Sequence, residues 1–167
     1  MPPQAANHSL VRPALRLAVD VPQGWAFRDL GGDVVLEIYA RTPHPSAPQA
    51  APAENAAARP SLAVIQVVAI NREGVSLDDW ATQAIKDSQE LQSDLEVTSR
   101  TKTQLSDGRE ALAITLKNPR GMQPLIQKML LAVTDRRAYG LLATAPESEM
   151  AAAEAAVKKC FDSFVVW

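Results

Sequence analysis

Leucine and valine alternate with polar or small residues between Leu15 and Val21, a period of two that is typical of a half-buried β-strand. After a Pro-Gln-Gly turn, a second strand is predicted over residues 34–40. Residues 62–70 are nearly continuously apolar and β-branched, which favours a central strand that is buried on both faces. The first part of the chain is therefore predicted to form the middle of a β-sheet.

Two later segments follow the period of an α-helix. Before the first, Ser76 offers an N-cap hydroxyl, and Asp78 and Asp79 lie in the first turn, where the helix dipole favours anions. Its predicted buried stripe is Leu77, Trp80, Ala81, Ala84, Ile85, Ser88 and Leu91. The second helix closes the chain with a cap at Thr144 or Ser148, and its stripe is Met150, Ala153, Val157, Cys160, Phe161 and Phe164. Each stripe is expected to pack against the sheet.

The Asp107-Gly108 pair predicts a β-hairpin with a two-residue turn, because both residues tolerate positive φ. That turn sorts the hairpin into an apolar face and a second face that carries Arg100, Lys102 and Lys117. Strands over residues 125–133 and 138–143 then complete an antiparallel meander. The predicted cross-strand pairs of the hairpin are Leu105 with Glu110, Thr103 with Leu112 and Thr101 with Ile114.

The 167 residues, of which 47% are hydrophobic, suit a single domain with its own core. We expect this domain to span residues 14–167. Residues 1–13 are small, polar and interrupted by three prolines, so a disordered leader is expected there. Residues 42–60 hold five prolines and seven alanines, which predicts a flexible insertion between two strands rather than a domain boundary.

Four features, in this order, resemble the PsbP-like domains over about residues 14–167. They are Pro22-x-Gly24-Trp25 after the first strand, Leu77-x-x-Trp80 in a helix, Leu105-Ser-Asp-Gly108 at a hairpin tip, and a closing helix that ends at Phe164. The family includes small bacterial lipoproteins, the photosystem II extrinsic subunit and secretion-effector chaperones. The resemblance implies an α+β fold, an antiparallel sheet of about six to seven strands flanked by helices as an α/β/α sandwich. It also implies a non-enzymatic role in binding other proteins.

No pattern in the sequence predicts a catalytic, cofactor or metal site. The only histidines, His8 and His44, fall in the expected leader and insertion, where packing cannot hold an imidazole for catalysis or metal binding. Cys160 lies on the apolar stripe of the last helix and is expected to be a buried, unreactive thiol. Trp25 and Trp80 are expected in the core, whereas the position of Trp167 indicates no role.

Charge is distributed unevenly along the chain. The net charge is -2, without a long basic run, so nucleic acid is not expected as a partner. Residues 76–96 carry six carboxylates and one lysine, whereas residues 100–137 carry eight basic and three acidic side chains. An ordinary solvated surface is one interpretation. The other is a basic binding face for an acidic partner or anionic lipid headgroups, formed by Arg100, Lys102, Lys117 and Arg120.

These observations predict a non-catalytic binding or accessory domain that recognises a partner protein and needs no cofactor. We expect it to be the soluble part of an exported or lipid-anchored bacterial protein, periplasmic or associated with the cell envelope, with a membrane tether outside this sequence. The alternative is a cytoplasmic, chaperone-like adaptor whose sheet face shelters an apolar client segment such as a secretion effector. An enzyme of unrecognised type comes third, and it would need a pocket with convergent polar groups. A signal peptide or lipobox before residue 1 would favour the first interpretation.

Overall fold

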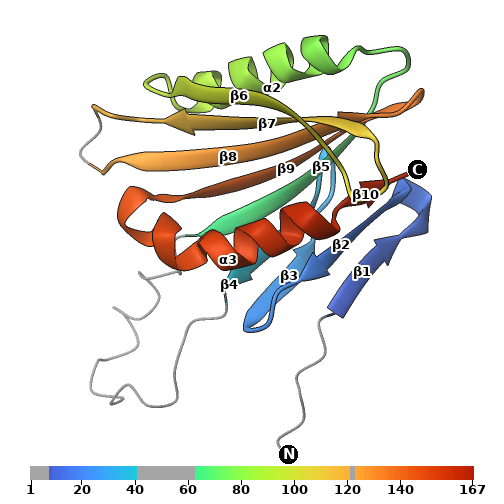
Figure 1. Cartoon of the computed structure of the whole chain (residues 1–167), viewed down its shortest axis with the longest axis horizontal. Coiled ribbons are helices and arrows are strands. Elements are labelled where there is room, and N and C mark those ends of the chain that lie inside the picture. The colour runs from blue at the N-terminus through green and yellow to red at the C-terminus, as the bar shows by residue number, and fades with distance from the viewer. Residues whose placement is uncertain (1–7, 41–62, 121–122) are drawn as a thin grey trace, which may run out of the picture.

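A computed structural model describes residues 8–40, 63–120 and 123–167 (Figure 1). The described elements in chain order are β1 His8–Arg12, η1 Pro13–Leu15, β2 Leu17–Val21, β3 Trp25–Asp29, β4 Val34–Ala40, β5 Val64–Asn71, α2 Leu77–Leu91, β6 Glu96–Gln104, β7 Glu110–Lys117, β8 Leu125–Val133, β9 Arg137–Pro146, α3 Glu147–Ser163 and β10 Val165–Val166. The expected insertion at 42–60 lies outside the described residues.

Two antiparallel sheets carry the fold. The larger has seven strands in the order β3-β4-β5-β9-β8-β7-β6, and the smaller has three in the order β1-β2-β10. The predicted α+β class with a large antiparallel sheet is confirmed. The smaller sheet is an addition that the sequence did not indicate, because its strands come from opposite ends of the described chain.

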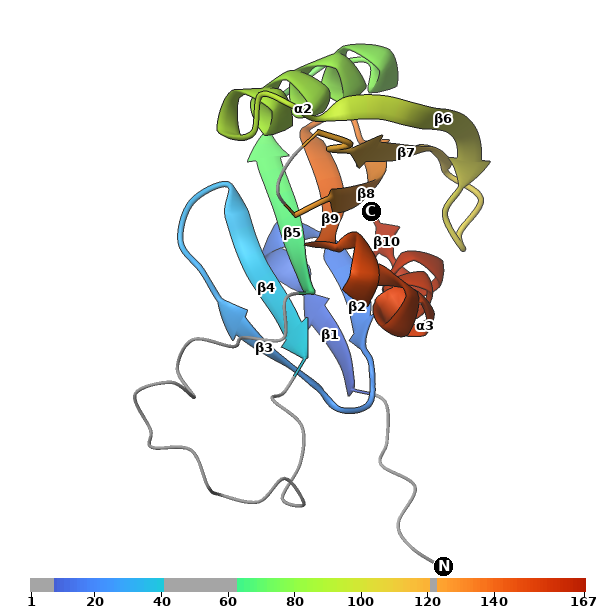
Figure 2. The same cartoon turned by 90° about the vertical axis from the view of Figure 1, so that its left-hand side faces the viewer.

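The larger sheet has a hydrophobic core on each face. Helix α2 packs on one face, against Leu112, Met129 and Leu131. Helix α3 and the smaller sheet cover the other face, as Figure 2 shows. Strand β5 lies between β4 and β9 and contributes Ile65 to one core and Val68 to the other, so its predicted burial on both faces is confirmed.

Helix α2 follows its sequence signals closely. The amide N–H of Asp79 donates to the Ser76 Oγ over 3.1 Å, which confirms the predicted N-cap. Trp80 is 2% exposed, and its indole N–H donates to the main-chain oxygen of Tyr139 over 2.8 Å. The predicted burial of Leu91 is wrong, because this side chain is 91% exposed. Leu91 is the last residue of the helix and lines a surface cavity instead of joining the core between α2 and the sheet.

The N-terminal boundary is also different from the expected one. Strand β1 pairs with β2 in an antiparallel ladder that places Leu10 opposite Val19, and Leu10 is buried. A disordered leader is therefore wrong for residues 8–13, and residues 1–7 lie outside the described residues. The main-chain ladder and one buried leucine hold a segment whose composition alone does not predict order.

Helix α3 has the predicted stripe but not the predicted cap. Met150, Ala153, Val157 and Cys160 are buried as expected. The N-cap residue is Pro146, at the end of β9, and no side chain caps the helix. The amide N–H of Glu147 donates instead to the main-chain oxygen of Pro124 over 2.8 Å, so a neighbouring loop satisfies a free N–H of the first turn.

Candidate anion-binding site

The hairpin between β6 and β7 has a three-residue loop, not the two-residue turn predicted from Asp107-Gly108. The N–H of Leu105 donates to the Arg109 oxygen over 2.8 Å, and the N–H of Gly108 donates to the Leu105 oxygen over 2.9 Å. Gly108 has a φ of +87°, the left-handed conformation that closes a three-residue hairpin loop. Both loop lengths use an Asp-Gly pair, so the local sequence does not distinguish them.

The longer loop shifts the strand register by one residue. Lys102 lies opposite Leu112 and Arg100 lies opposite Ile114, where the sequence analysis had threonines. Directly opposed residues point to the same face of a sheet, so Arg100 and Lys102 lie on the α2 face. Lys117 alternates with Leu116 on β7 and lies on the α3 face.

The predicted basic face is therefore wrong as an arrangement, since the sheet separates its members. Arg100 pairs with Asp78 of α2 at 2.5 Å, and Lys102 pairs with Glu110 at 3.4 Å. Lys117 pairs with Glu147 of α3 at 3.5 Å, and Arg120 is exposed beside the undescribed residues 121–122. An involvement of these four residues in binding stays a prediction.

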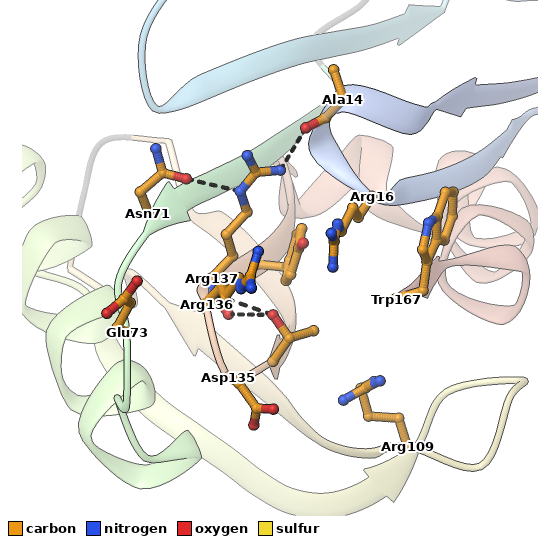
Figure 3. Close-up of a pocket in the computed structure, with 11 residues that line it drawn as sticks. Ala14, Arg16, Asn71, Glu73, Arg109, Asp135, Arg136, Arg137 and Trp167 are labelled. Carbon is orange, nitrogen blue, oxygen red and sulfur yellow. Dashed lines mark hydrogen bonds between the residues drawn. The ribbon is translucent and has the colours of Figure 1, made fainter.

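A different group of basic residues lines a cavity of about 780 Å³ (Figure 3). Five segments meet there: the η1–β2 junction, the end of β5, the β6–β7 loop, the β8–β9 turn and the C-terminal residue. The charged and aromatic side chains among its lining residues are Arg16, Glu73, Arg109, Asp135, Arg136, Arg137, Tyr139 and Trp167. We refer to Arg16, Arg109, Arg136 and Arg137 as the arginine cluster.

Arg137 is fixed across the junction of the two sheets. Its Nε donates to the Asn71 Oδ1 and its Nη1 donates to the main-chain oxygen of Ala14, each over 2.8 Å (Figure 3). Tyr139, which is buried, donates its hydroxyl to the Leu15 oxygen over 3.0 Å. These bonds hold η1 against the end of β5 and the start of β9, and they leave three Arg137 N–H donors for a ligand.

Arg109 and Arg16 approach the cavity from other segments. The Arg109 Nη1 donates to the Val133 oxygen over 3.3 Å, while its Nε is buried without a partner. Arg16 has a φ of +53°, the only positive φ of a non-glycine residue in the described chain. Its main-chain oxygen accepts from the Trp167 N–H over 3.0 Å. Such a conformation costs about 1 kcal/mol or more and persists where surrounding bonds impose it, often at functional sites.

No carboxylate of the described residues forms an ion pair with the arginine cluster. Within residues 8–40, 63–120 and 123–167, none of its four guanidinium groups forms an ion pair, whereas Arg12, Arg28 and Arg100 each do. The cavity contains two carboxylates, Glu73 and Asp135, which are likewise without ion pairs in that part of the chain. Four cations and two anions leave an excess of positive charge. Guanidinium forks bind carboxylates and phosphates through paired hydrogen bonds, so the cavity suits an anionic ligand.

The residues considered for catalysis lie elsewhere. His8 is exposed on β1, which corrects its expected place in a loose leader, and His44 lies outside the described residues. Cys160 is fully buried, as predicted, and its Sγ donates to the Asp20 oxygen over 3.3 Å. Burial, together with the Asp20 charge, raises the pKa of this thiol from 9.0 to about 12, although Lys159 opposes the shift. The described residues contain no cluster of possible metal ligands.

Tryptophan positions agree only in part with the sequence analysis. Trp80 is in the core as expected, and Trp25 is half-buried at its edge. Trp167, to which the sequence assigned no role, is 46% exposed and forms one wall of the cavity.

No helix in the described part of the chain has both the length and the apolar character needed to cross a lipid bilayer.

No protein-family model matches the chain, and no curated protein matches its sequence. Solved structures do match it, and they show a PsbP-like fold, which confirms the resemblance at the level of the fold. Cyanobacterial PsbP (CyanoP) from Synechocystis sp. PCC 6803 is similar over 100% of this chain and 96% of its own, with a TM-score of 0.70 and 10% identity.

Two further structures share the fold. The Ran-binding protein Mog1p of Saccharomyces cerevisiae is similar over 96% of this chain and 95% of its own, with a TM-score of 0.63 and 13% identity. LpqN, involved in cell envelope biogenesis of Mycobacterium tuberculosis, is similar over 98% of this chain and 87% of its own, with a TM-score of 0.63 and 13% identity. At these identities the likeness concerns the fold alone.

Proposed function

We propose that this protein is a non-catalytic binding domain that recognises a partner protein through the cavity of the arginine cluster. The observation that carries the proposal is the group of four guanidiniums without ion pairs at the junction of the two sheets. What distinguishes this surface is that four such guanidiniums line one cavity, whereas Arg12 and Arg28 each pair with a carboxylate of another strand. Unpaired, partly fixed cations favour recognition of an acidic group on another molecule.

A binding role is also consistent with the chemistry available. The described histidine is exposed on a strand, and the thiol is buried and protonated. Neither provides an activated nucleophile next to a base. Two proteins of this fold carry names that fit such a role, a Ran-binding protein and a protein of cell envelope biogenesis. They support a binding domain without identifying the partner of this one.

For location, we propose an exported or lipid-anchored protein of the bacterial envelope, with a cytoplasmic adaptor as the alternative. The adaptor would need an open apolar sheet face for its client. Helices α2 and α3 occupy the two faces of the large sheet. The exposed large apolar side chains of the described chain are spread over several elements: Val11, Phe27, Leu91, Val97 and Trp167. The envelope protein is therefore favoured.

The proposal is tested by partner capture in the source organism. Tagged wild-type protein is cross-linked in cells and its partner identified, and the capture is repeated with R16Q/R136Q. Neither Arg16 nor Arg136 makes a side-chain hydrogen bond in the described chain, so the fold should be retained. The matched control, K86Q/K158Q, removes two exposed cations of α2 and α3 that do not line the cavity.

We expect the partner to be lost with R16Q/R136Q and kept with K86Q/K158Q. Circular dichroism establishes that both variants are folded. Equal capture by the two variants would refute recognition at the cavity. Recovery of the tagged protein in the envelope fraction supports the proposed location, and recovery in the cytoplasm supports the adaptor.

A further inference from the structure

The arginine cluster contains two kinds of side chain. Arg109 and Arg137 are anchored by hydrogen bonds to main-chain oxygens, at 3.3 Å and 2.8 Å, so their guanidiniums are held in place before a ligand arrives. Arg16 and Arg136 are exposed and make no side-chain hydrogen bond in the described chain. A ligand therefore meets two guanidinium groups that are already held in place and two that can change conformation. Fixed donors reduce the entropy that is lost on binding.

The charge balance defines how much negative charge the cavity accepts. Two carboxylates face four guanidiniums, so a ligand with two negative charges neutralises the excess. Glu73 and Asp135 would repel a ligand with many negative charges, and their oxygens can accept hydrogen bonds from N–H donors. A ligand that binds both the guanidiniums and the two carboxylates must carry carboxylates and N–H groups together, as a peptide does.

Trp167 adds an apolar surface to the site. Trp167 is 46% exposed, and its ring lies beside Arg16 among the residues that line the cavity (Figure 3). The cavity volume of about 780 Å³ is in the range that accommodates ligands of many atoms. An inorganic anion would leave the ring and the two carboxylates without contacts, whereas a peptide can place a flat side chain on the ring.

We infer that the ligand of this cavity is an acidic peptide segment that presents two neighbouring carboxylates to the arginine cluster and an aromatic side chain to Trp167. This inference rests on the proposed function and specifies its partner. The Arg109 Nε, which is buried and has no partner in the described chain, is a further donor beside the cavity that the protein itself does not satisfy.

The test uses defined peptides with the full chain. The probe is a blocked hexapeptide that contains one adjacent glutamate–aspartate pair, one phenylalanine and three glycines, and its counterpart replaces the two acids by glutamine and asparagine. Binding is measured by titration calorimetry in low salt, and Trp167 fluorescence gives a second signal that is absent in W167F. Inorganic phosphate and a nucleoside monophosphate are added as competitors.

We expect wild type and K86Q/K158Q to bind the acidic peptide with affinities within about threefold of each other, because neither lysine lines the cavity and an exposed charge contributes little. We expect R16Q/R136Q to bind at least about tenfold more weakly, because two charge-assisted contacts are lost. The neutral peptide should not bind. If R16Q/R136Q does not fold, R136Q alone should still weaken binding several-fold, because Arg136 is exposed.

Three results would overturn the inference: equal loss in both double variants, equal binding of the neutral peptide, or displacement of the acidic peptide by equimolar phosphate or nucleotide. The last would identify a general anion site. Failure of the proposed function looks different, because the peptide would still bind while cellular capture of a partner would not depend on the cluster.

Discussion

The contact between Trp80 and the sheet is the point at which helix α2 is fixed, and its loss has a magnitude that can be worked out. Phenylalanine at this position keeps an aromatic ring but removes the indole N–H, which leaves the Tyr139 oxygen without this donor in a buried site. That costs about 1–3 kcal/mol. Trp80 is only 2% exposed, so the smaller phenylalanine ring leaves a cavity in the core, at a further cost of about 1 kcal/mol.

Trp80→Phe should therefore lower the free energy of unfolding by about 2–4 kcal/mol. For a domain of this size, that corresponds to a fall in Tm of roughly 4–16 °C. The assay is urea and thermal unfolding followed by far-UV circular dichroism, with an unchanged m-value showing that the unfolded state is the same. The control is Trp167→Phe, which should alter stability by less than about 0.5 kcal/mol because Trp167 is exposed. Equal stability of the two variants would refute the role assigned to Trp80.

Three other predictions concern single features of the fold. Cys160→Ala should cost about 1–2 kcal/mol at neutral pH. Burial raises the thiol pKa from 9.0 to about 12, so between these pH values the native state retains a proton that the unfolded state releases. Wild type should therefore lose stability relative to Cys160→Ala as the pH rises through this range. A difference in unfolding free energy that stays constant with pH would contradict the shift. Gly108→Ala should destabilise by about 1–2 kcal/mol, because its φ is +87°, whereas Gly31→Ala, at an open position without positive φ, should be nearly neutral in the same unfolding assay. A double-mutant cycle on Arg100 and Asp78 should give a small but measurable coupling of about 0.2–0.5 kcal/mol at low salt for this exposed pair. A coupling of zero there would argue against the observed register.

Local signals in the sequence predicted the elements well. Ser76 and the aspartates after it identify the start of α2, and the apolar run before it identifies β5, because capping and periodicity depend on neighbouring residues. The resemblance to PsbP-like domains rested on the order of such elements, and the solved structures confirm it as a fold. Properties that depend on one short stretch were thus accessible.

Properties that depend on residues distant in the sequence could not be predicted from it. Residues 8–12 contain a single leucine that is buried, and they are ordered because β2 supplies the ladder. Leu91 continues the helical stripe, but it lines a surface cavity at the end of the helix and stays exposed. In the hairpin, Asp107-Gly108 fits loops of two or three residues, and the one-residue difference moved Arg100 and Lys102 to the other face.

The arginine cluster illustrates the same limit at the candidate site. Arg136 and Arg137 are adjacent in a turn, and a basic doublet there was the one local signal available. Arg16 joins them through a left-handed backbone conformation that a strand pattern does not predict. Trp167 comes from the far end of the chain. The cavity forms where the two sheets meet, and no spacing of residues in the sequence predicts that contact.

The most direct test of anion recognition at this cavity is an NMR titration of the arginine side chains. In protein labelled with ¹⁵N, the Nε–Hε signals are assigned by single Arg→Gln variants and followed as the acidic hexapeptide is added. The account predicts saturable shifts of the Arg109 and Arg137 signals, with the Arg100 signal in the β6–β7 hairpin unchanged. Shifts confined to Arg100, with the signals of the arginine cluster unmoved, would contradict the account and place binding on the hairpin instead.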